Sequence, residues 1–200
     1  MQTERRIILA SSSPRRRELL EKIGVPFEVD PSDYPEEQHL DLSSGSRVSP
    51  QEIVKAVSLG KAQAVAQKYP NAIIIAADTI GVLRDAIIGK PQTPGEARKM
   101  LRSLSGKSHR VITGLTLIDT RSHKIALRLV ETRVYFKPLS PREIANYVKT
   151  GEPLDKAGAY AIQGLGSVMV EKIKGDYYNV MGLPLSALAE CLKEFGLKVL

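Results

Sequence analysis

The chain has 200 residues, of which 42% are hydrophobic and 26% are charged, as in ordinary soluble globular proteins. Lysine and arginine total 29 against 22 aspartates and glutamates, and the resulting net charge of +7 favours anionic partners such as nucleotides, nucleic acid or anionic surfaces. The single cysteine, Cys191, excludes an internal disulfide and a cysteine-based zinc site, and the longest apolar run, residues 72–77, is far shorter than the roughly 20 residues that cross a bilayer. We therefore expect one domain over residues 1–200, a cytoplasmic location and no membrane partner.

Local sequence patterns predict both helices and strands. Three segments, at 49–52, 93–96 and 140–143, read Ser/Thr-Pro-x-Glu and combine a capping box with a proline at the first helical position. Ser13 and Pro14 open an earlier helix in a similar way. In chain order we expect a strand over 6–10, a helix from 14 that ends at Gly24, a strand over 26–30, a polar loop over 31–48, a helix over 50–68, a strand over 72–77, a helix over 94–104, strands over 109–119 and 126–136, a helix over 141–149, a strand over 167–173 and a helix over 185–195.

The order of these elements indicates the fold class. Strands and helices alternate early in the chain, whereas residues 109–119 and 126–136 form the two strands of a hairpin. We therefore predict an α/β protein with a mixed twisted sheet that is flanked by helices and bent into two lobes.

The stretch "SSSPRRR" (11–17) brings serine hydroxyls and arginine guanidiniums to a predicted helix start. The first turn of a helix exposes N–H groups that attract anions, and arginine provides a planar fork that suits phosphate oxygens. A nucleotide's phosphates would balance the three arginines. The same letters also suit a capped helix with a solvated basic face.

The stretch "AADTIGVLRDAIIGKP" (76–91) suggests a second polar cluster. Asp78 directly follows a buried strand, where ligand crevices open at the carboxyl edge of a sheet. Thr79 comes next, and Lys90 lies 12 residues after Asp78, beyond an expected turn. A carboxylate, a hydroxyl and an ammonium brought together suit a metal–phosphate site. Alternatively, Asp78 caps a turn and Lys90 is a surface lysine.

Three further segments carry candidate residues. The glycine-rich stretch 151–166 includes Gln163, whose amide offers a donor and an acceptor to the edge of a base, although such a stretch is also an ordinary loop. Lys61 lies on the helix over 50–68 and is either a phosphate ligand or a surface lysine. Glu36 and Glu37 lie in the polar loop, where one of them could help Asp78 to hold a divalent cation if the loop folds over the site.

Taken together and in this order, these segments resemble the Maf family of nucleotide pyrophosphatases. The resemblance is carried by "LASSSPRRRELLEKIG", "EEQ", "GKA", "AADT", "GKP", "LSGKSHRVITG", "GEPLDKAGAYAIQG" and "YYNVMGLPL", which span nearly the whole chain. It implies a fold similar to the inosine triphosphate pyrophosphatases, with a cleft between two lobes. It also implies hydrolysis of a nucleoside triphosphate to the monophosphate and pyrophosphate with a divalent cation, Mg²⁺ or Mn²⁺.

The resemblance also implies roles for individual residues. The sequences "SPRR" and "QG" are similar to the branch that acts on dTTP and UTP, whereas the sister branch that acts on 7-methyl-GTP tends to differ at both places. By this match Asp78 is the catalytic acid–base, Glu37 and Asp78 hold the metal, and Arg15, Thr79 and Gln163 determine specificity. Substrate contacts fall to Ser11, Arg16, Lys61 and Lys90 as well.

Two alternatives stay open. One is the 7-methyl-GTP pyrophosphatase of the sister branch. The other is a nucleic-acid-binding regulator of cell division, which the net charge of +7 would help. No aromatic residues cluster with the arginines and no nucleic-acid-binding motif is present, so we do not expect a nucleic-acid partner. The oligomeric state is also open, with a homodimer as one option.

Overall fold

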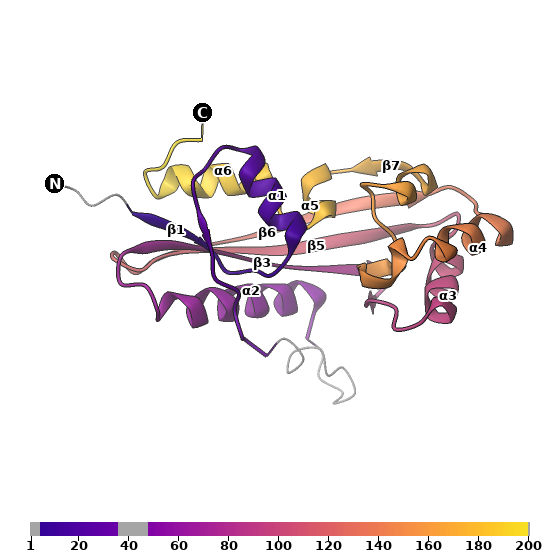
Figure 1. The fold of residues 1–200 in the computed structure, drawn as a ribbon, viewed down its shortest axis with the longest axis horizontal. Helices are drawn as coiled ribbons and strands as arrows, with labels where there is room; N and C mark the ends of the chain where they lie inside the picture. Colours follow the sequence, from indigo (N-terminus) through magenta and orange to yellow (C-terminus); the bar gives the residue numbers. More distant parts are fainter. Residues whose placement is uncertain (1–4, 36–47, 200) are drawn as a thin grey trace. The chain divides into compact units, whose positions relative to one another are not determined.

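The computed structural model describes residues 5–35 and 48–199, and in this part of the chain seven strands form one mixed sheet (Figure 1). The strand order is β2-β1-β3-β5-β6-β7, with β4 paired to β3 outside this path. β1 pairs in parallel with β2 and β3, whereas the β3–β4 and β6–β7 pairs are antiparallel. The strands are β1 (Arg6–Leu9), β2 (Glu28–Val29), β3 (Ala72–Leu83), β4 (Ala86–Ile88), β5 (Ser108–Asp119), β6 (Lys124–Phe136) and β7 (Val170–Lys174).

The helices begin where local capping signals place them. Ser49 and Ser140 form complete capping boxes with Glu52 and Glu143, and the hydroxyl of Thr93 accepts a hydrogen bond from the N–H of Glu96. The α-helices are α1 (Pro14–Lys22), α2 (Pro50–Ala66), α3 (Pro94–Leu104), α4 (Pro141–Lys149), α5 (Tyr177–Met181) and α6 (Leu185–Glu194); short 3₁₀ helices are η3 (Glu152–Asp155), η4 (Ala157–Ala159) and η5 (Leu165–Met169). The predicted α/β class, with a mixed sheet flanked by helices, is confirmed.

The chain divides into two compact units. The first unit comprises residues 1–79, 113–130 and 182–200, and the second comprises residues 80–112 and 131–181. The prediction of a single domain with an inosine triphosphate pyrophosphatase-like cleft stays a prediction. Among the described residues, none of the helices combines the length and the apolar character that a membrane span needs.

In the first unit, α2 covers one face of the sheet and α1 lies on the other face (Figure 1). Ile8, Ile74 and Ala76 are buried with Ala62 and Val65 of α2 in an apolar cluster. Gly114 of β5 marks the closest approach of α2, because a Cβ at this position would lie 2.3 Å from the carbonyl oxygen of Val54. A side chain here would therefore push α2 away from the sheet.

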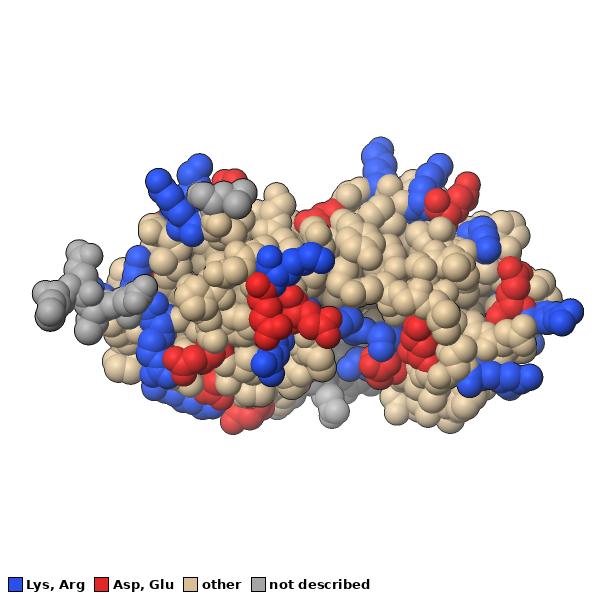
Figure 2. Space-filling view, turned by 45° about the horizontal axis from the view of Figure 1, so that its top comes forward, with Lys and Arg blue, Asp and Glu red and all other residues tan. Residues whose placement is uncertain are grey.

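Charged side chains of both signs occur on the face shown in Figure 2. Some of the charged side chains of the protein pair with one another, such as Arg17 with Glu21 on α1 and Lys68 with Asp30. Exposed pairs of this kind contribute little to stability, about 0–1 kcal/mol each.

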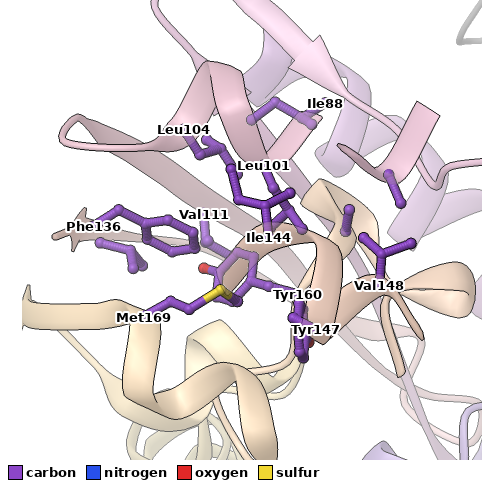
Figure 3. Packing of buried hydrophobic residues seen from close by; sticks show 13 residues of the cluster. Ile88, Leu101, Leu104, Val111, Phe136, Ile144, Tyr147, Val148, Tyr160 and Met169 are labelled. Atoms are coloured by element: carbon purple, nitrogen blue, oxygen red, sulfur yellow. The ribbon is translucent and has the colours of Figure 1, made fainter. Parts of the chain in front are cut away.

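The second unit is built around an apolar cluster that includes the rings of Phe136 and Tyr160 (Figure 3), against which the ring of His109 packs. The rings of His109, Phe136 and Tyr160 meet edge to face, with centroids 4.8–5.4 Å apart. Tyr147 of α4 belongs to the same cluster and is 7% exposed. Helix α3 packs against α4 and against η3 and η4.

Several predicted strand boundaries differ from the structure, and the largest differences are at the end of β3 and the start of β7. β3 continues to Leu83 because residues 81–83 pair with β4, a strand that the sequence did not predict. Asp78 therefore lies inside β3 and not after it. Residues 165–169 form η5, so β7 begins at Val170 and not at residue 167.

Candidate functional site

The start of α1 differs from the other proline-started helices. The hydroxyls of Ser49, Thr93 and Ser140 each accept a hydrogen bond from the N–H three residues later, whereas the hydroxyl of Ser13 makes no capping bond. The N–H of Arg15 has no hydrogen-bond partner among the described residues. This helix start therefore keeps a donor for an external anion, in the direction that the helix dipole favours.

Arg16 is held in a fixed orientation by three acceptors. Its Nε donates to the carbonyl oxygen of Gly182 at 2.8 Å, its Nη1 to Ser11 Oγ at 3.4 Å and its Nη2 to Thr79 Oγ1 at 3.2 Å. All four residues belong to the first unit. Three predicted site residues, Ser11, Arg16 and Thr79, are thus brought together although 68 positions separate the first from the last, 79 − 11.

The hydroxyl of Ser11 acts mainly as an acceptor within this network. It receives the N–H of Ser13 at 3.2 Å and the Arg16 guanidinium at 3.4 Å, and the residue is 8% exposed. A serine hydroxyl has one proton and two lone pairs. With both lone pairs engaged, the proton of Ser11 is left to donate to a ligand oxygen.

Thr113 completes the network, and sequence reasoning missed it. Its Oγ1 lies 2.9 Å from Thr79 Oγ1, and the residue is fully buried on β5. Gly182 was missed as well, because it acts through its backbone carbonyl, which accepts from Arg16 and, at 3.4 Å, from Thr79. A signal for Thr113 existed only in its position: a threonine inside the apolar run 111–118 must satisfy its hydroxyl.

Lys61 and Asp78 form a buried ion pair in the same unit. Lys61 Nζ on α2 lies 2.9 Å from Asp78 Oδ1, and the two side chains are 9% and 12% exposed. Asp78 Oδ2 has no hydrogen-bond partner among the described residues. Since Asp78 and Thr79 are consecutive in β3, they point to opposite faces of the sheet. The Lys61–Asp78 ion pair and the Arg16 network therefore lie on opposite faces of the sheet, at consecutive residues of β3.

Tyr34 packs on α2 next to this ion pair. A Cβ at Gly60 would lie 2.2 Å from Cζ of the Tyr34 ring, so only glycine allows the ring to rest on the helix there. Tyr34 leads into residues 36–47, and the predicted metal ligand Glu37 and its neighbour Glu36 lie outside the described residues. Among residues 5–35 and 48–199, no group of three or more His, Cys, Asp or Glu side chains is placed to hold a metal ion.

Lys90 and Gln163 belong to the second unit. Lys90 is exposed just after β4, and Gln163 is exposed between Ala161 and η5. Among the candidate residues that are described, the structure brings together Ser11, Arg16, Lys61, Asp78 and Thr79 within the first unit, and Arg15 lies beside Arg16 on α1.

The mixed sheet and the helices that flank it define an α/β protein, in which the uncapped start of α1 and the adjoining basic groups have the chemistry that suits an anion such as phosphate. The chain belongs to the family described as Maf-like protein, whose model matches residues 6–195. It is 46% identical over 197 residues to the dTTP/UTP pyrophosphatase of Dictyoglomus thermophilum, covering 98% of this chain and 100% of that protein.

Two further relatives carry the same name. The chain is 48% identical over 197 residues to the dTTP/UTP pyrophosphatase of Thermoanaerobacter pseudethanolicus, covering 98% of this chain and 100% of that protein. It is also 48% identical over 196 residues to the protein of that name from Methanococcoides burtonii, covering 98% and 97%.

Proposed function

We propose that this protein is a hydrolase that cleaves nucleoside triphosphates, dTTP and UTP above all, to the nucleoside monophosphate and inorganic pyrophosphate. The observation that carries the proposal is the pair of consecutive residues on β3: Asp78 bonded to Lys61, and Thr79 bonded to Arg16. The carboxylate and the hydroxyl that hold the two cations are thus consecutive on one strand, with Lys61 on one face of the sheet and Arg16 on the other. The relatives' shared name supports the substrate.

The reaction is attack by water on the α-phosphorus, with pyrophosphate as the leaving group. A triphosphate carries several negative charges that repel an incoming nucleophile, so most of the catalysis is positioning and charge neutralisation. Arg16, Lys61 and the start of α1 supply positive charge, and Ser11 donates its hydroxyl proton to a phosphate oxygen. Lys90 contributes a further cation by the family resemblance.

Asp78 is the group that we assign to the attacking water. Its Oδ1 accepts from Lys61 at 2.9 Å, which fixes the plane of the carboxylate. Oδ2 is the oxygen that remains to orient the water and accept its proton.

The donors at Asp78 also fit a divalent cation, Mg²⁺ or Mn²⁺. Mg²⁺ is commonly held by one or two carboxylates together with substrate phosphates, and an ionised carboxylate oxygen has more than one lone pair. The carboxylates of Asp78 and, by the resemblance, Glu37 would hold it. When bound, the cation supplies charge neutralisation on the phosphate oxygens.

Gln163 is the residue that we assign to the base, with Arg15 and Thr79 as the other specificity positions. Its exposed amide can donate to and accept from the edge of a pyrimidine. A bidentate contact of this type discriminates by about 1–3 kcal/mol, which gives preference without exclusivity. Replacement by alanine should therefore shift the ratio of rates for dTTP and CTP by about 5- to 150-fold.

A pyrophosphate-release screen tests the function. The purified protein is assayed with dTTP, UTP, CTP and 7-methyl-GTP, with Mg²⁺ and after treatment with EDTA. We expect dTTP and UTP to be hydrolysed fastest, and EDTA to remove activity that added Mg²⁺ restores. Asp78→Asn should abolish turnover while nucleotide binding persists, and Asp30→Asn, at a half-buried carboxylate that also pairs with a lysine, serves as the control. Near-normal turnover by Asp78→Asn would overturn the assignment.

The alternative functions have less support, since the relatives' name favours neither 7-methyl-GTP hydrolysis nor a regulator. The same screen distinguishes them. The cytoplasmic location and the homodimer stay predictions, and light scattering after gel filtration tests the second.

A further inference from the structure

Two side chains of the second unit anchor the backbone on both sides of Gln163. Tyr147, at the end of α4, donates its hydroxyl to Glu152 Oε1 at 2.8 Å and accepts the N–H of Ala161 at 3.1 Å. Glu152 accepts the N–H of Leu165 on Oε2 and that of Gly166 on Oε1, each at 3.0 Å. We call Tyr147, Glu152 and these three backbone amides the loop clamp.

The loop clamp fixes both ends of a short turn. Ala161 lies before Gln163, and Leu165 and Gly166 lie after it, so every anchored amide is within three residues of the exposed Gln163. The hydroxyl of Tyr147 accepts a hydrogen bond from the N–H of Ala161 and donates one to Glu152, so the two bonds form a chain. Hydrogen bonds to an ionised carboxylate such as that of Glu152 are stronger than bonds between neutral groups.

Two glycines are required for the turn to close around these side chains. Gly164 has φ +126°, and a Cβ there would lie 2.8 Å from Glu152 Oε2. A Cβ at Gly166 would lie 2.5 Å from the carbonyl oxygen of Ala161 and 2.7 Å from the Tyr147 hydroxyl. The backbone at Gly164 and Gly166 therefore packs directly against the Glu152 carboxylate and the Tyr147 hydroxyl.

The pKa shifts of Glu152 and Tyr147 keep the loop clamp in one protonation state. Burial alone would raise the pKa of Glu152, but the hydrogen bonds from Tyr147, Gly166 and Leu165 outweigh it and lower the pKa below its ordinary value of 4.5. Burial and the bond to Glu152 raise the pKa of Tyr147. The carboxylate is thus an acceptor and the phenol a donor throughout the neutral range.

Base selection by an amide needs a fixed frame. A half-turn of a glutamine amide exchanges its donor and acceptor, so the same side chain can meet either uracil or thymine, which present O4 as an acceptor, or cytosine, which presents an N4 amino donor. Discrimination therefore depends on where the backbone places the amide relative to the base.

We propose that Glu152 and Tyr147 are positioning residues for pyrimidine selection. They act by fixing the backbone on both sides of Gln163. The inference rests on the proposed function and deepens it. It assigns no contact between these two side chains and the nucleotide.

Glu152→Gln is the main variant, because it preserves size but replaces one acceptor oxygen by an NH₂ group that faces a donor. Since both carboxylate oxygens accept protons from N–H or O–H groups, one of these bonds must be lost. Glu143→Gln is the matched control: Glu143, in the same unit, likewise accepts a backbone N–H and a hydroxyl, both from Ser140. Tyr147→Phe is the second variant, which removes the donor to Glu152 and the acceptor of the Ala161 N–H.

The readout is the ratio of kcat/KM for dTTP to that for CTP, measured by pyrophosphate release. We expect Glu152→Gln to lower this ratio at least fivefold, Tyr147→Phe to lower it in the same direction, and Glu143→Gln to leave it unchanged. Combined with Gln163→Ala, Glu152→Gln should lower the ratio no further, because both act through one amide. A purely structural role would reduce both rates alike and leave the ratio unchanged.

The outcomes separate the inference from the proposed function. If the wild-type protein releases pyrophosphate and Gln163→Ala shifts the ratio but Glu152→Gln and Tyr147→Phe do not, the inference is overturned and the function stands. If Gln163→Ala leaves the ratio unchanged, the inference is overturned together with the role of Gln163. No pyrophosphate release by the wild-type protein overturns the function and, with it, the inference.

Discussion

Lys61 Nζ lies 2.9 Å from Asp78 Oδ1, and the side chains of the two residues are only 9% and 12% exposed. Two charges that are removed from water in this way depend on each other, because each leaves a poorly solvated partner if the other is deleted. The pair joins α2 to the central strand β3 and places an ammonium beside the carboxylate that we assign to the attacking water. The Lys61–Asp78 contact therefore contributes to the stability of the fold and, in the proposed function, to catalysis.

Lys61→Met should lower both activity and stability. Loss of the ammonium leaves the Asp78 carboxylate buried, which costs about 3–5 kcal/mol, and removes a cation from the triphosphate. We expect turnover of dTTP to fall by at least 100-fold, measured at a temperature where circular dichroism shows the variant to be folded. Lys68→Met is the control, since Lys68 is 48% exposed and lies 3.3 Å from Asp30. Its stability should change by no more than about 1 kcal/mol. Wild-type turnover by Lys61→Met would contradict the assigned role.

The parts of the fold that local chemistry determines could be predicted from the sequence. The helices that begin after Ser49, Thr93 and Ser140 start where predicted, because a cap, a proline and a glutamate act within four residues. The end of β3 could not be predicted. It depends on pairing with β4, a strand of three residues whose sequence alone is too short to carry a pattern.

The candidate site divides in the same way. Ser11, Arg16 and Thr79 carry side chains whose chemistry drew attention in the sequence, and hydrogen bonds of the Arg16 guanidinium join them, whereas Asp78 pairs with Lys61. Thr113 resembles any strand threonine until its partner, 34 positions away, is known. The contribution of Gly182 is a carbonyl oxygen, and no residue type signals that.

Thr113→Val should reduce activity with little change in fold. The substitution keeps the shape of the side chain but removes the hydroxyl that lies 2.9 Å from Thr79 Oγ1. A net hydrogen bond contributes about 0.5–1.5 kcal/mol, so kcat/KM for dTTP should fall by about 3- to 12-fold. Thr116→Val is the matched control: Thr116 is also fully buried on β5, but its hydroxyl lies 2.9 Å from Ser58 on α2. Equal losses of kcat/KM in both variants would argue against a role for Thr113 in the site.

Gly114→Ala should destabilise the first unit. The new Cβ would lie 2.3 Å from the Val54 carbonyl oxygen and 2.9 Å from Ser58 Oγ, and the backbone atom cannot move aside without shifting α2. Overpacking of this kind costs about 1–3 kcal/mol, which urea denaturation can measure. Gly95→Ala, on the exposed side of α3, is the control. Its nearest atom is 3.7 Å away, and better helix propensity should add about 0.5–1 kcal/mol. Equal stability of Gly114→Ala and the wild type would exclude this close approach.

His109 should make the protein less stable in mild acid. Its imidazole is 2% exposed, Nε2 bonds to the Tyr160 hydroxyl at 2.9 Å, and Nδ1 is buried without a partner among the described residues. Burial lowers the pKa of His109 from 6.5 to about 4. Between these two values the unfolded chain binds a proton that the folded chain does not. The stability contributed by the neutral ring is therefore complete above about pH 6.5 and is lost as the pH falls towards 4.

The expected loss between pH 7.5 and pH 5 is about 2 kcal/mol, measured as the change in the free energy of unfolding in urea. His109→Phe keeps an aromatic ring between Phe136 and Tyr160 and should flatten this pH dependence, even if its stability at pH 7.5 is lower because the Tyr160 hydroxyl loses its partner. His123→Asn, on the exposed connection between β5 and β6, should keep the wild-type slope. The slope and not the absolute stability is decisive, since only titration of a buried imidazole makes the two variants differ in it. The same slope in His109→Phe as in the wild type would assign the acid sensitivity to other groups.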